Sequence, residues 1–122
     1  MNRLFGGFAI LAALLAAPAH AHHSFSMFSM DKEVVLTGEV KDFQWTNPHI
    51  WLQLTVPGAD GKTGEWSIEG TSPNVLSRQG WTKRSVKAGE KVTVTIHPLR
   101  DGTPGASLVK VVTADGKVVG AE

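Results

Sequence analysis

Two adjacent histidines offer the most distinctive chemistry in the chain. His22 and His23 follow directly after Ala21, at the point where an export signal would be cut. Cleavage there would leave a free α-amine on His22, which can chelate a metal ion together with the ring nitrogen Nδ1. Nitrogen-rich sites of this kind suit Cu(II). The alternative interpretation is a solvated chain end without a ligand, as termini often are.

The other candidate ligands are single residues later in the chain. His49 begins a predicted strand, and we interpret it either as a third nitrogen ligand or as a hydrogen-bond partner that stabilises the preceding turn. Methionine sulfur suits Cu(I), although methionine more often fills gaps in packing. A histidine near the end of a later strand is expected at the surface. The candidate metal ligands are therefore His22, His23 and His49, with Met27, Met30 and His97 as weaker candidates.

Residues 2–21 have the order of residues that is typical of a secretory signal peptide. Arg3 precedes an apolar run over residues 4–17, and small residues close the segment. The run is shorter than the ~20 apolar residues that cross a membrane, so a cleaved signal is favoured over a retained anchor. A second small-residue site would cut after Ala19 and expose residues 20–22, whose third-position histidine also binds Cu(II). We expect a periplasmic or secreted protein with no membrane span after processing.

Composition narrows the possible functions. The chain has no cysteine, which excludes disulfides and cysteine-based metal or redox chemistry. Removing residues 1–21 from the 122 leaves 101 residues, enough for one stable domain. That processed chain carries 11 basic and 11 acidic residues, so its formal charge is zero. A balanced charge does not predict a nucleic acid or an anionic membrane as partner.

Known catalytic motifs are absent from the sequence. It contains no Gly-x-Ser-x-Gly, no phosphate-binding loop and no His-Glu-x-x-His, and it lacks cysteine and tyrosine. We therefore predict a binding protein rather than an enzyme.

Alternating apolar and polar residues predict strands in the processed chain. Gly38 within the first run predicts a bulge or a sharp bend. Between the third and fourth runs, Ser72 and Pro73 are typical of a helix start, and Gly80 is typical of a helix end. The expected strands cover residues 34–41, 50–56, 65–69, 91–99 and about 107–113.

The order of these elements predicts the fold class. It is β-β-β-α-β-β, which indicates an all-β domain with one short helical segment, built as a five-stranded OB-fold-like barrel. Another small antiparallel barrel or sandwich is the alternative. We expect the signal at residues 1–21, an N-terminal arm at 22–32 that lies on the barrel, and the barrel domain at 33–122.

An aromatic surface is the second candidate site. If the first two strands pair through the short turn at residues 46–48, two aromatic residues before the turn share a face with His49 and another aromatic after it. Exposed aromatic clusters mark a binding site or are covered by another segment, and the arm is the expected cover. The candidate ligand-binding residues are Phe43, Trp45, Trp51 and Arg100.

Several short motifs, in this order, resemble those of a family of small exported bacterial proteins catalogued as a domain of unknown function. The resemblance covers essentially the whole processed chain and implies export and a compact β-rich domain, but no activity. His22, His23 and His49 lie within the matching motifs. The motifs are Ala21-His22-His23-Ser24-Phe25, Thr46-Asn47-Pro48-His49, Ser72-Pro73-Asn74, Gly80-Trp81 and Lys87-Ala88-Gly89-Glu90.

Two functions follow as hypotheses. The first is a periplasmic or secreted copper-binding protein that uses His22, with His23 or His49 completing the site. The second is a metal-free OB-type module that binds a small molecule, a glycan or a protein partner on the aromatic surface.

Overall fold

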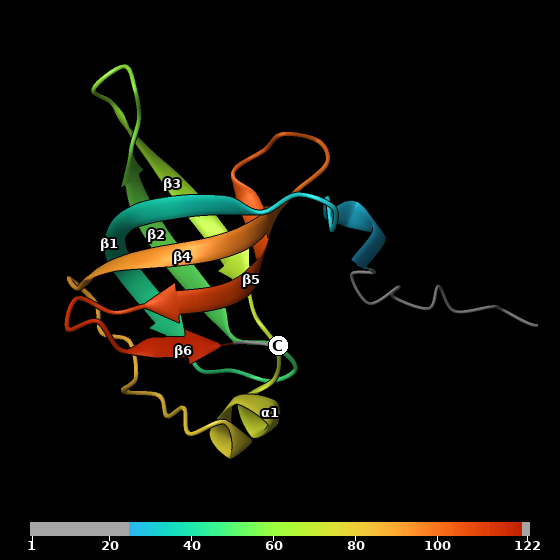
Figure 1. Ribbon diagram of the computed structural model, residues 1–122, viewed down its shortest axis with the longest axis vertical. Helices are drawn as coiled ribbons and strands as arrows, with labels where there is room; N and C mark the ends of the chain where they lie inside the picture. The colour runs from blue at the N-terminus through green and yellow to red at the C-terminus, as the bar shows by residue number, and fades with distance from the viewer. Residues whose placement is uncertain (1–24, 121–122) are drawn as a thin grey trace, which may run out of the picture.

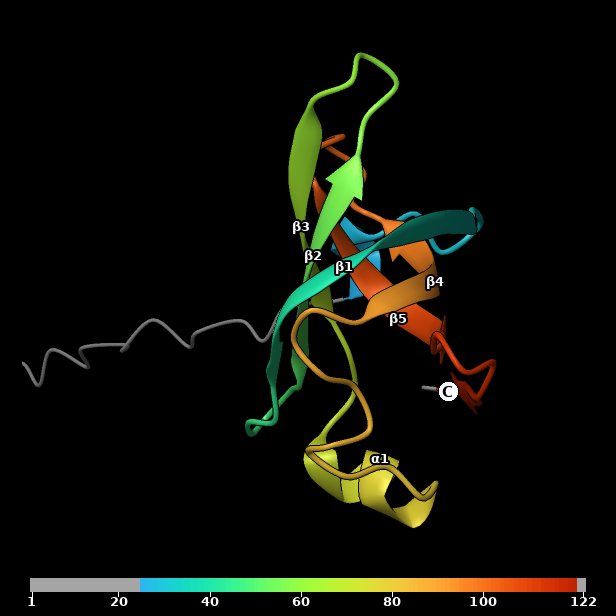
Figure 2. The ribbon, with the colours of Figure 1, turned by 90° about the vertical axis from the view of Figure 1, so that its left-hand side faces the viewer.

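The computed structural model describes residues 25–120, which form a small twisted barrel with one helix at its end (Figures 1 and 2). The predicted signal, its cleavage site and both His22 and His23 lie outside the described residues. The elements in chain order are η1 (Phe25–Met27), β1 (Val34–Gln44), β2 (Trp51–Pro57), β3 (Thr63–Glu69), α1 (Pro73–Arg78), β4 (Lys91–Pro98), β5 (Gly105–Val112) and β6 (Val118–Gly120).

Strand pairing closes the sheet into a five-stranded barrel. β1 pairs antiparallel with both β2 and β4, β2 pairs with β3, and β4 pairs with β5. The barrel is completed by β3 and β5, which run parallel to each other. This is the strand order of the OB-fold, so the predicted fold class is confirmed. β6 is an addition to the predicted strands and extends the sheet from β5 outside the barrel.

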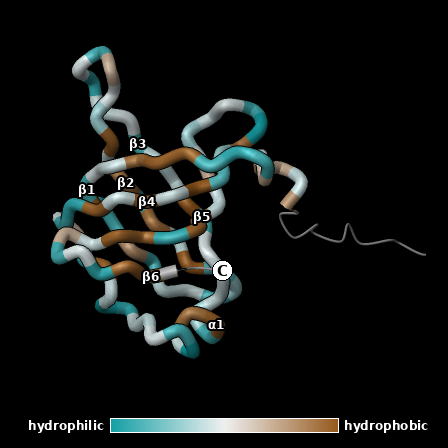
Figure 3. Tube along the Cα trace, viewed as in Figure 1, coloured by the Kyte–Doolittle hydropathy of each residue, from teal (hydrophilic) through white to brown (hydrophobic). Residues whose placement is uncertain are grey.

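Apolar side chains fill the barrel as the alternation predicted. The strands carry most of the apolar residues, and the connecting loops are mostly hydrophilic (Figure 3). Trp81 and Val86, which follow α1, belong to the same core. Its fully buried strand residues include Val40, Leu52, Leu54, Ile68, Val92, Val94 and Ile96.

The helix has the ends that the sequence predicted. Ser72 is the N-cap, and its Oγ accepts a hydrogen bond from the backbone N–H of Val75, with 3.3 Å between the two atoms. Pro73 occupies the first turn, and Gly80 follows the helix with φ of +89°. Leu76 is fully buried, so the helix closes one end of the barrel through an apolar contact.

A β-bulge in β1 overturns the predicted aromatic surface. The register of β1 against β2 shifts between Val40 and Asp42, three residues after the position at which Gly38 had suggested a bulge. The extra residue inverts the alternation, so Phe43 lies opposite Leu52 and packs against the core. Trp45 also packs against the core, and the centroids of the Trp45 and Phe43 rings are 6.0 Å apart. These two aromatic residues therefore do not share the outer face of the barrel with Trp51.

The N-terminal arm lies on the barrel beside His49 and Trp51, on the outer face from which Phe43 and Trp45 are turned away. Phe28 is 5% exposed and forms an isolated β-bridge with Leu99, in the loop between β4 and β5. The backbone N–H of Ser29 donates to the carbonyl oxygen of Pro98, with 2.8 Å between N and O. The N–H of Arg100 donates in turn to the carbonyl oxygen of Met27 at 2.9 Å. The arm is thus fixed beside the β4–β5 loop.

Gly38 lacks room for a side chain. A Cβ there would lie 2.6 Å from the carbonyl oxygen of Thr55, a backbone atom that cannot move without disturbing β2. We predict that Gly38→Ala lowers the free energy of unfolding by about 1–3 kcal/mol, measured by urea denaturation. Gly64→Ala in β3 is the matched control, because a Cβ there meets nothing within 4 Å. Equal losses in the two variants would contradict the prediction.

Phe28 is the residue that holds the arm. Phe28→Ala should lower the free energy of unfolding by about 3 kcal/mol, because a buried phenyl ring is lost and a cavity remains. Phe25, in the same arm, is 71% exposed, so Phe25→Ala should change stability by less than about 0.5 kcal/mol. Urea denaturation of both variants measures the difference, and a similar midpoint for the two would show that the arm contributes nothing to stability.

Candidate functional site

A cavity of about 340 Å³ lies between the arm and the outer face of the barrel. Phe25, Phe28 and Met30 line it from the arm, while Leu108 and Val109 line it from β5. Its polar groups come from the loop before β2, from the end of β3 and the segment after it, from the end of β4 and from β5. They are His49, Glu69, Thr71, His97 and Ser107. The structure therefore brings both histidines of the barrel domain to one cavity.

Barrel closure explains why these residues meet. Ser107 in β5 lies opposite Glu69 in β3 and also opposite His97 in β4. Residues directly opposite each other on neighbouring strands share a face of the sheet. Glu69, Ser107 and His97 consequently form a row across three strands on the outside of the barrel, at the end nearest His49. Trp51 extends the row on the other side of Glu69.

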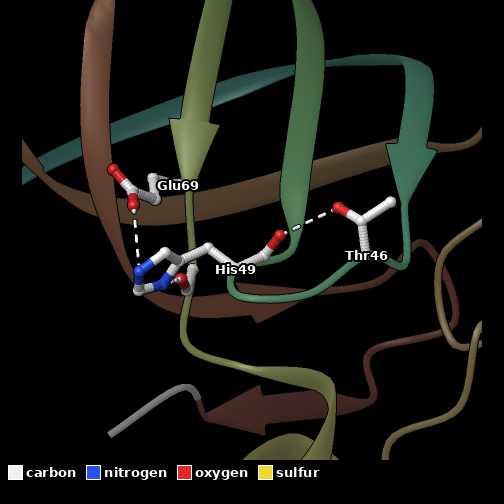
Figure 4. Close-up of polar contacts among 4 residues, drawn as sticks. Thr46, His49 and Glu69 are labelled. Carbon is white, nitrogen blue, oxygen red and sulfur yellow. Dashed lines mark hydrogen bonds and ion pairs between the residues drawn. The ribbon is translucent and has the colours of Figure 1, made fainter. Parts of the chain in front are cut away.

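The His49 ring is held in one orientation. Its Nδ1 lies 3.0 Å from the carbonyl oxygen of Gly70. Because a carbonyl oxygen can only accept, Nδ1 carries the proton and donates it. Nε2 then faces the carboxylate of Glu69, 3.5 Å from Oε1 (Figure 4). The loop before β2 is fixed separately, since Thr46 Oγ1 donates to the backbone carbonyl oxygen of His49 at 3.0 Å.

The His97 ring is oriented in the same way. Its Nδ1 lies 2.6 Å from the carbonyl oxygen of Lys32, the last residue of the arm, and must therefore donate to it. In the neutral ring, Nε2 is then the nitrogen with a lone pair. Both histidines thus use Nδ1 to bond the backbone and keep Nε2 for another partner. The expectation that His97 is a simple surface residue is replaced by a half-buried residue in the wall of the cavity.

The two methionines occupy different positions. Met30 lines the cavity that contains the histidines and is 45% exposed. Met27 lines a neighbouring cavity of about 250 Å³, together with Phe28, Trp51 and Glu69. Among the predicted sulfur ligands, Met30 is therefore the one that shares a cavity with His49 and His97.

Arg100 and Trp51 do not form one surface with Phe43 and Trp45. The Arg100 side chain turns toward the arm, where its Nε donates to the carbonyl oxygen of Ser26 at 3.0 Å. Trp51 is half-buried on the outer face and lines the second cavity. The four predicted ligand-binding residues are divided between the core, the arm contact and this cavity.

The loop after β4, which forms one wall of the second cavity, is shaped by its own hydrogen bonds. The Asp101 carboxylate accepts from Thr103 Oγ1 at 2.6 Å and from the Thr103 backbone N–H at 2.9 Å. These bonds, with the hydroxyl contributing most, hold the pKa of Asp101 below its ordinary value.

Glu69, like Thr71 and Ser107, was not among the predicted site residues, and it is the charged one of the three. It is only 9% exposed, although its position in β3 points it away from the core. The arm and β5 cover it, and neither contact can be inferred from the alternation of residues within β3. The sequence offered one weak signal for Glu69 as a site residue, which is a glutamate at the end of a strand with a glycine directly after it.

The described residues do not by themselves form a complete set of metal ligands. Within residues 25–120, no three side chains of histidine, cysteine, aspartate or glutamate come close enough together to hold one metal ion. His49 and Glu69 form a pair, and His97 lies across Ser107 from that pair. The remaining predicted ligands, His22 and His23, are outside the described residues.

In the described part of the chain, no helix is both long and apolar enough to cross a membrane.

Comparison with solved structures shows a likeness to the mitochondrial single-stranded DNA-binding protein Rim1 of S. cerevisiae. The two chains are 13% identical, with a TM-score of 0.50 over 68% of this chain and 94% of that one. At this identity the likeness concerns the fold alone, and it agrees with the OB-fold topology. No curated protein matches the sequence.

A family model matches most of the sequence. It covers residues 10–107 and carries the description "family of unknown function", DUF6152. The match includes every described residue that lines the larger cavity except Leu108 and Val109. The resemblance to a family of unknown function is thereby confirmed, and the chain belongs to the DUF6152 family.

Proposed function

We propose that this chain is an exported binding protein that holds copper between its processed N-terminus and the cavity beside the arm. The observation that carries the proposal is the convergence of His49 and His97 on that cavity, each with Nδ1 bonded to a backbone carbonyl. Histidines that ligate metals almost always donate their other ring N–H to a carbonyl or a carboxylate, which fixes the tautomer. Both rings have this arrangement.

The position of the arm supports a contribution from the N-terminal histidines. Phe25 lines the cavity, and His22 precedes it by three residues. Three residues of extended chain span at most about 11 Å, so a cut after Ala21 would leave an amino end that can lie no farther than this from Phe25. The α-amine and ring of His22 would supply two nitrogen ligands, and His23 or His49 would supply a third.

The donor types agree with copper. Amine and imidazole nitrogens suit Cu(II), and the Met30 thioether at the same cavity is the kind of ligand that Cu(I) prefers. Zero formal charge on the processed chain and the predicted signal are consistent with a small exported carrier. No lysine or arginine lines either of the two cavities in the part of the chain that the structure describes. We therefore do not extend the DNA binding of the mitochondrial protein to this chain.

A second candidate is a metal-free site for a small organic molecule in the same cavity. Its walls are mostly apolar, with Phe25, Phe28, Leu108 and Val109 around a few polar groups. Its volume of about 340 Å³ lies at the lower end of the range of small-molecule sites, roughly 300–1,000 Å³. This cavity takes the place of the aromatic surface that the sequence analysis expected.

The copper proposal predicts a dependence on the processed N-terminus. Protein purified after export is first weighed by intact-mass spectrometry, which identifies residue one, and is then titrated with Cu(II) by calorimetry. If residue one is His22, His22→Ala and His49→Ala should each weaken Cu(II) binding by about tenfold or more, because each removes a ligand. Ser24→Ala is the matched control in the arm and should bind as the unchanged protein does.

Two results of these titrations would count against the copper proposal. Equal Cu(II) affinity in His22→Ala and in the unchanged protein would reject the N-terminal site. Weak Cu(II) binding in every variant would favour the metal-free candidate.

A further inference from the structure

We propose that Glu69 is a direct ligand of the bound ion, and that Glu69 and His49 form a two-donor site for a divalent cation. This inference rests on the proposed metal-binding function and names a ligand and a class of ion that the sequence analysis did not. It starts from the burial of the Glu69 carboxylate, whose side chain is 11% exposed.

A carboxylate buried to this extent needs a cation beside it. Removing the charge from water is unfavourable unless a partner of opposite charge compensates. The ion pair that the structure gives Glu69 is with His49, since the cavities on both sides of the carboxylate are lined without lysine or arginine. The nearest comparison on the same strand is Glu65, which is exposed and paired with Lys41 at 2.6 Å.

The tautomer of His49 makes this contact unusual. Nδ1 donates to Gly70, so the neutral ring presents the lone pair of Nε2 to a carboxylate oxygen. Two acceptors that face each other repel unless a positive charge lies between them. A proton on Nε2 gives a structural ion pair, and a metal ion between the two atoms gives a ligand pair.

The separation of the two donors matches a ligand pair. Two donors that each lie about 2.0–2.1 Å from one ion at a tetrahedral angle are ~3.4 Å apart, and adjacent donors in a square plane are ~2.9 Å apart. The observed distance from Nε2 to Oε1 is 3.5 Å. The pair as it stands is thus spaced for a tetrahedral ion such as Zn(II), and it accepts Cu(II) if the two side chains draw closer.

The donor atoms of the His49–Glu69 pair do not suit copper in the Cu(I) state. Carboxylate oxygen is a poor ligand for the soft Cu(I) ion, which prefers sulfur. We infer that the His49–Glu69 pair binds Zn(II) and Cu(II) and contributes little to Cu(I). Ser107 and His97 face the same cavity across β5, and water can occupy the positions that these side chains leave open.

The test compares Glu69→Gln with Glu65→Gln, a matched control in the same strand. Both variants of the exported protein are titrated with Zn(II), with Cu(II) and, under reducing conditions, with Cu(I). We expect Glu69→Gln to weaken Zn(II) and Cu(II) binding by about tenfold or more and to leave Cu(I) affinity within about threefold. Glu65→Gln should leave all three unchanged. The melting temperature of each variant is measured in parallel without added metal.

The results also separate this inference from the proposed function. A lower melting temperature in Glu69→Gln with unchanged metal affinities would show a structural ion pair only and would overturn the inference. If His22→Ala abolishes Cu(II) binding and Glu69→Gln does not weaken it, the proposed function stands and the inference fails. If Glu69→Gln weakens Zn(II) and Cu(II) binding whereas His22→Ala has no effect, the inference stands and the N-terminal part of the proposed function fails.

Discussion

Parallel pairing of β3 with β5 is the interaction on which the rest of the structure depends. Without it the strands would form an open sheet, with β3 at one edge and its outer face exposed. With it, the beginning of β5 lies beside the ends of β3 and β4, and Glu69, Ser107 and His97 share one row. Glu69 thus joins the β4–β5 pair of His97 and Ser107 because the barrel closes.

The arm adds the second constraint. Phe28 is buried against Leu99, and the backbone hydrogen bonds at Ser29 and Arg100 fix the arm on either side of that contact. An arm held in this way covers the row of polar residues and converts an exposed strip of sheet into a cavity. It also explains how Glu69 comes to be buried on the outside of a barrel. The arm therefore removes the Glu69 carboxylate from water, and His49 is the partner that can compensate its charge.

Local patterns in the sequence predicted most of the fold. Alternation identified the strands and their buried faces, and Ser72, Pro73 and Gly80 defined the helix, because each feature depends on neighbouring residues alone. The bulge between Val40 and Asp42 was not predicted in its place. It depends on how β1 changes partner from β4 to β2, which is a tertiary property. That one residue turned Phe43 from the expected outer face toward the core, against which it packs.

The candidate site was predicted only in part, for the same reason. Placing His49 and His97 at one end of the barrel required only the strand order, and both line one cavity. Selecting Glu69 required the position of the arm, which no periodicity encodes. The aromatic surface was predicted from a register without the bulge, and it was wrong for that reason.

Burial of Glu69 bears on what the cavity is for. A structural ion pair inside a protein contributes little net stability, because the cost of removing both charges from water offsets their attraction. An apolar pair at the same positions would serve the barrel equally well as packing. An apolar pair would, however, offer no donors to a cation, which is why the proposed metal site depends on this carboxylate and this imidazole. The arm covers the carboxylate, so the proposed site would depend on the arm as well as on the two donors.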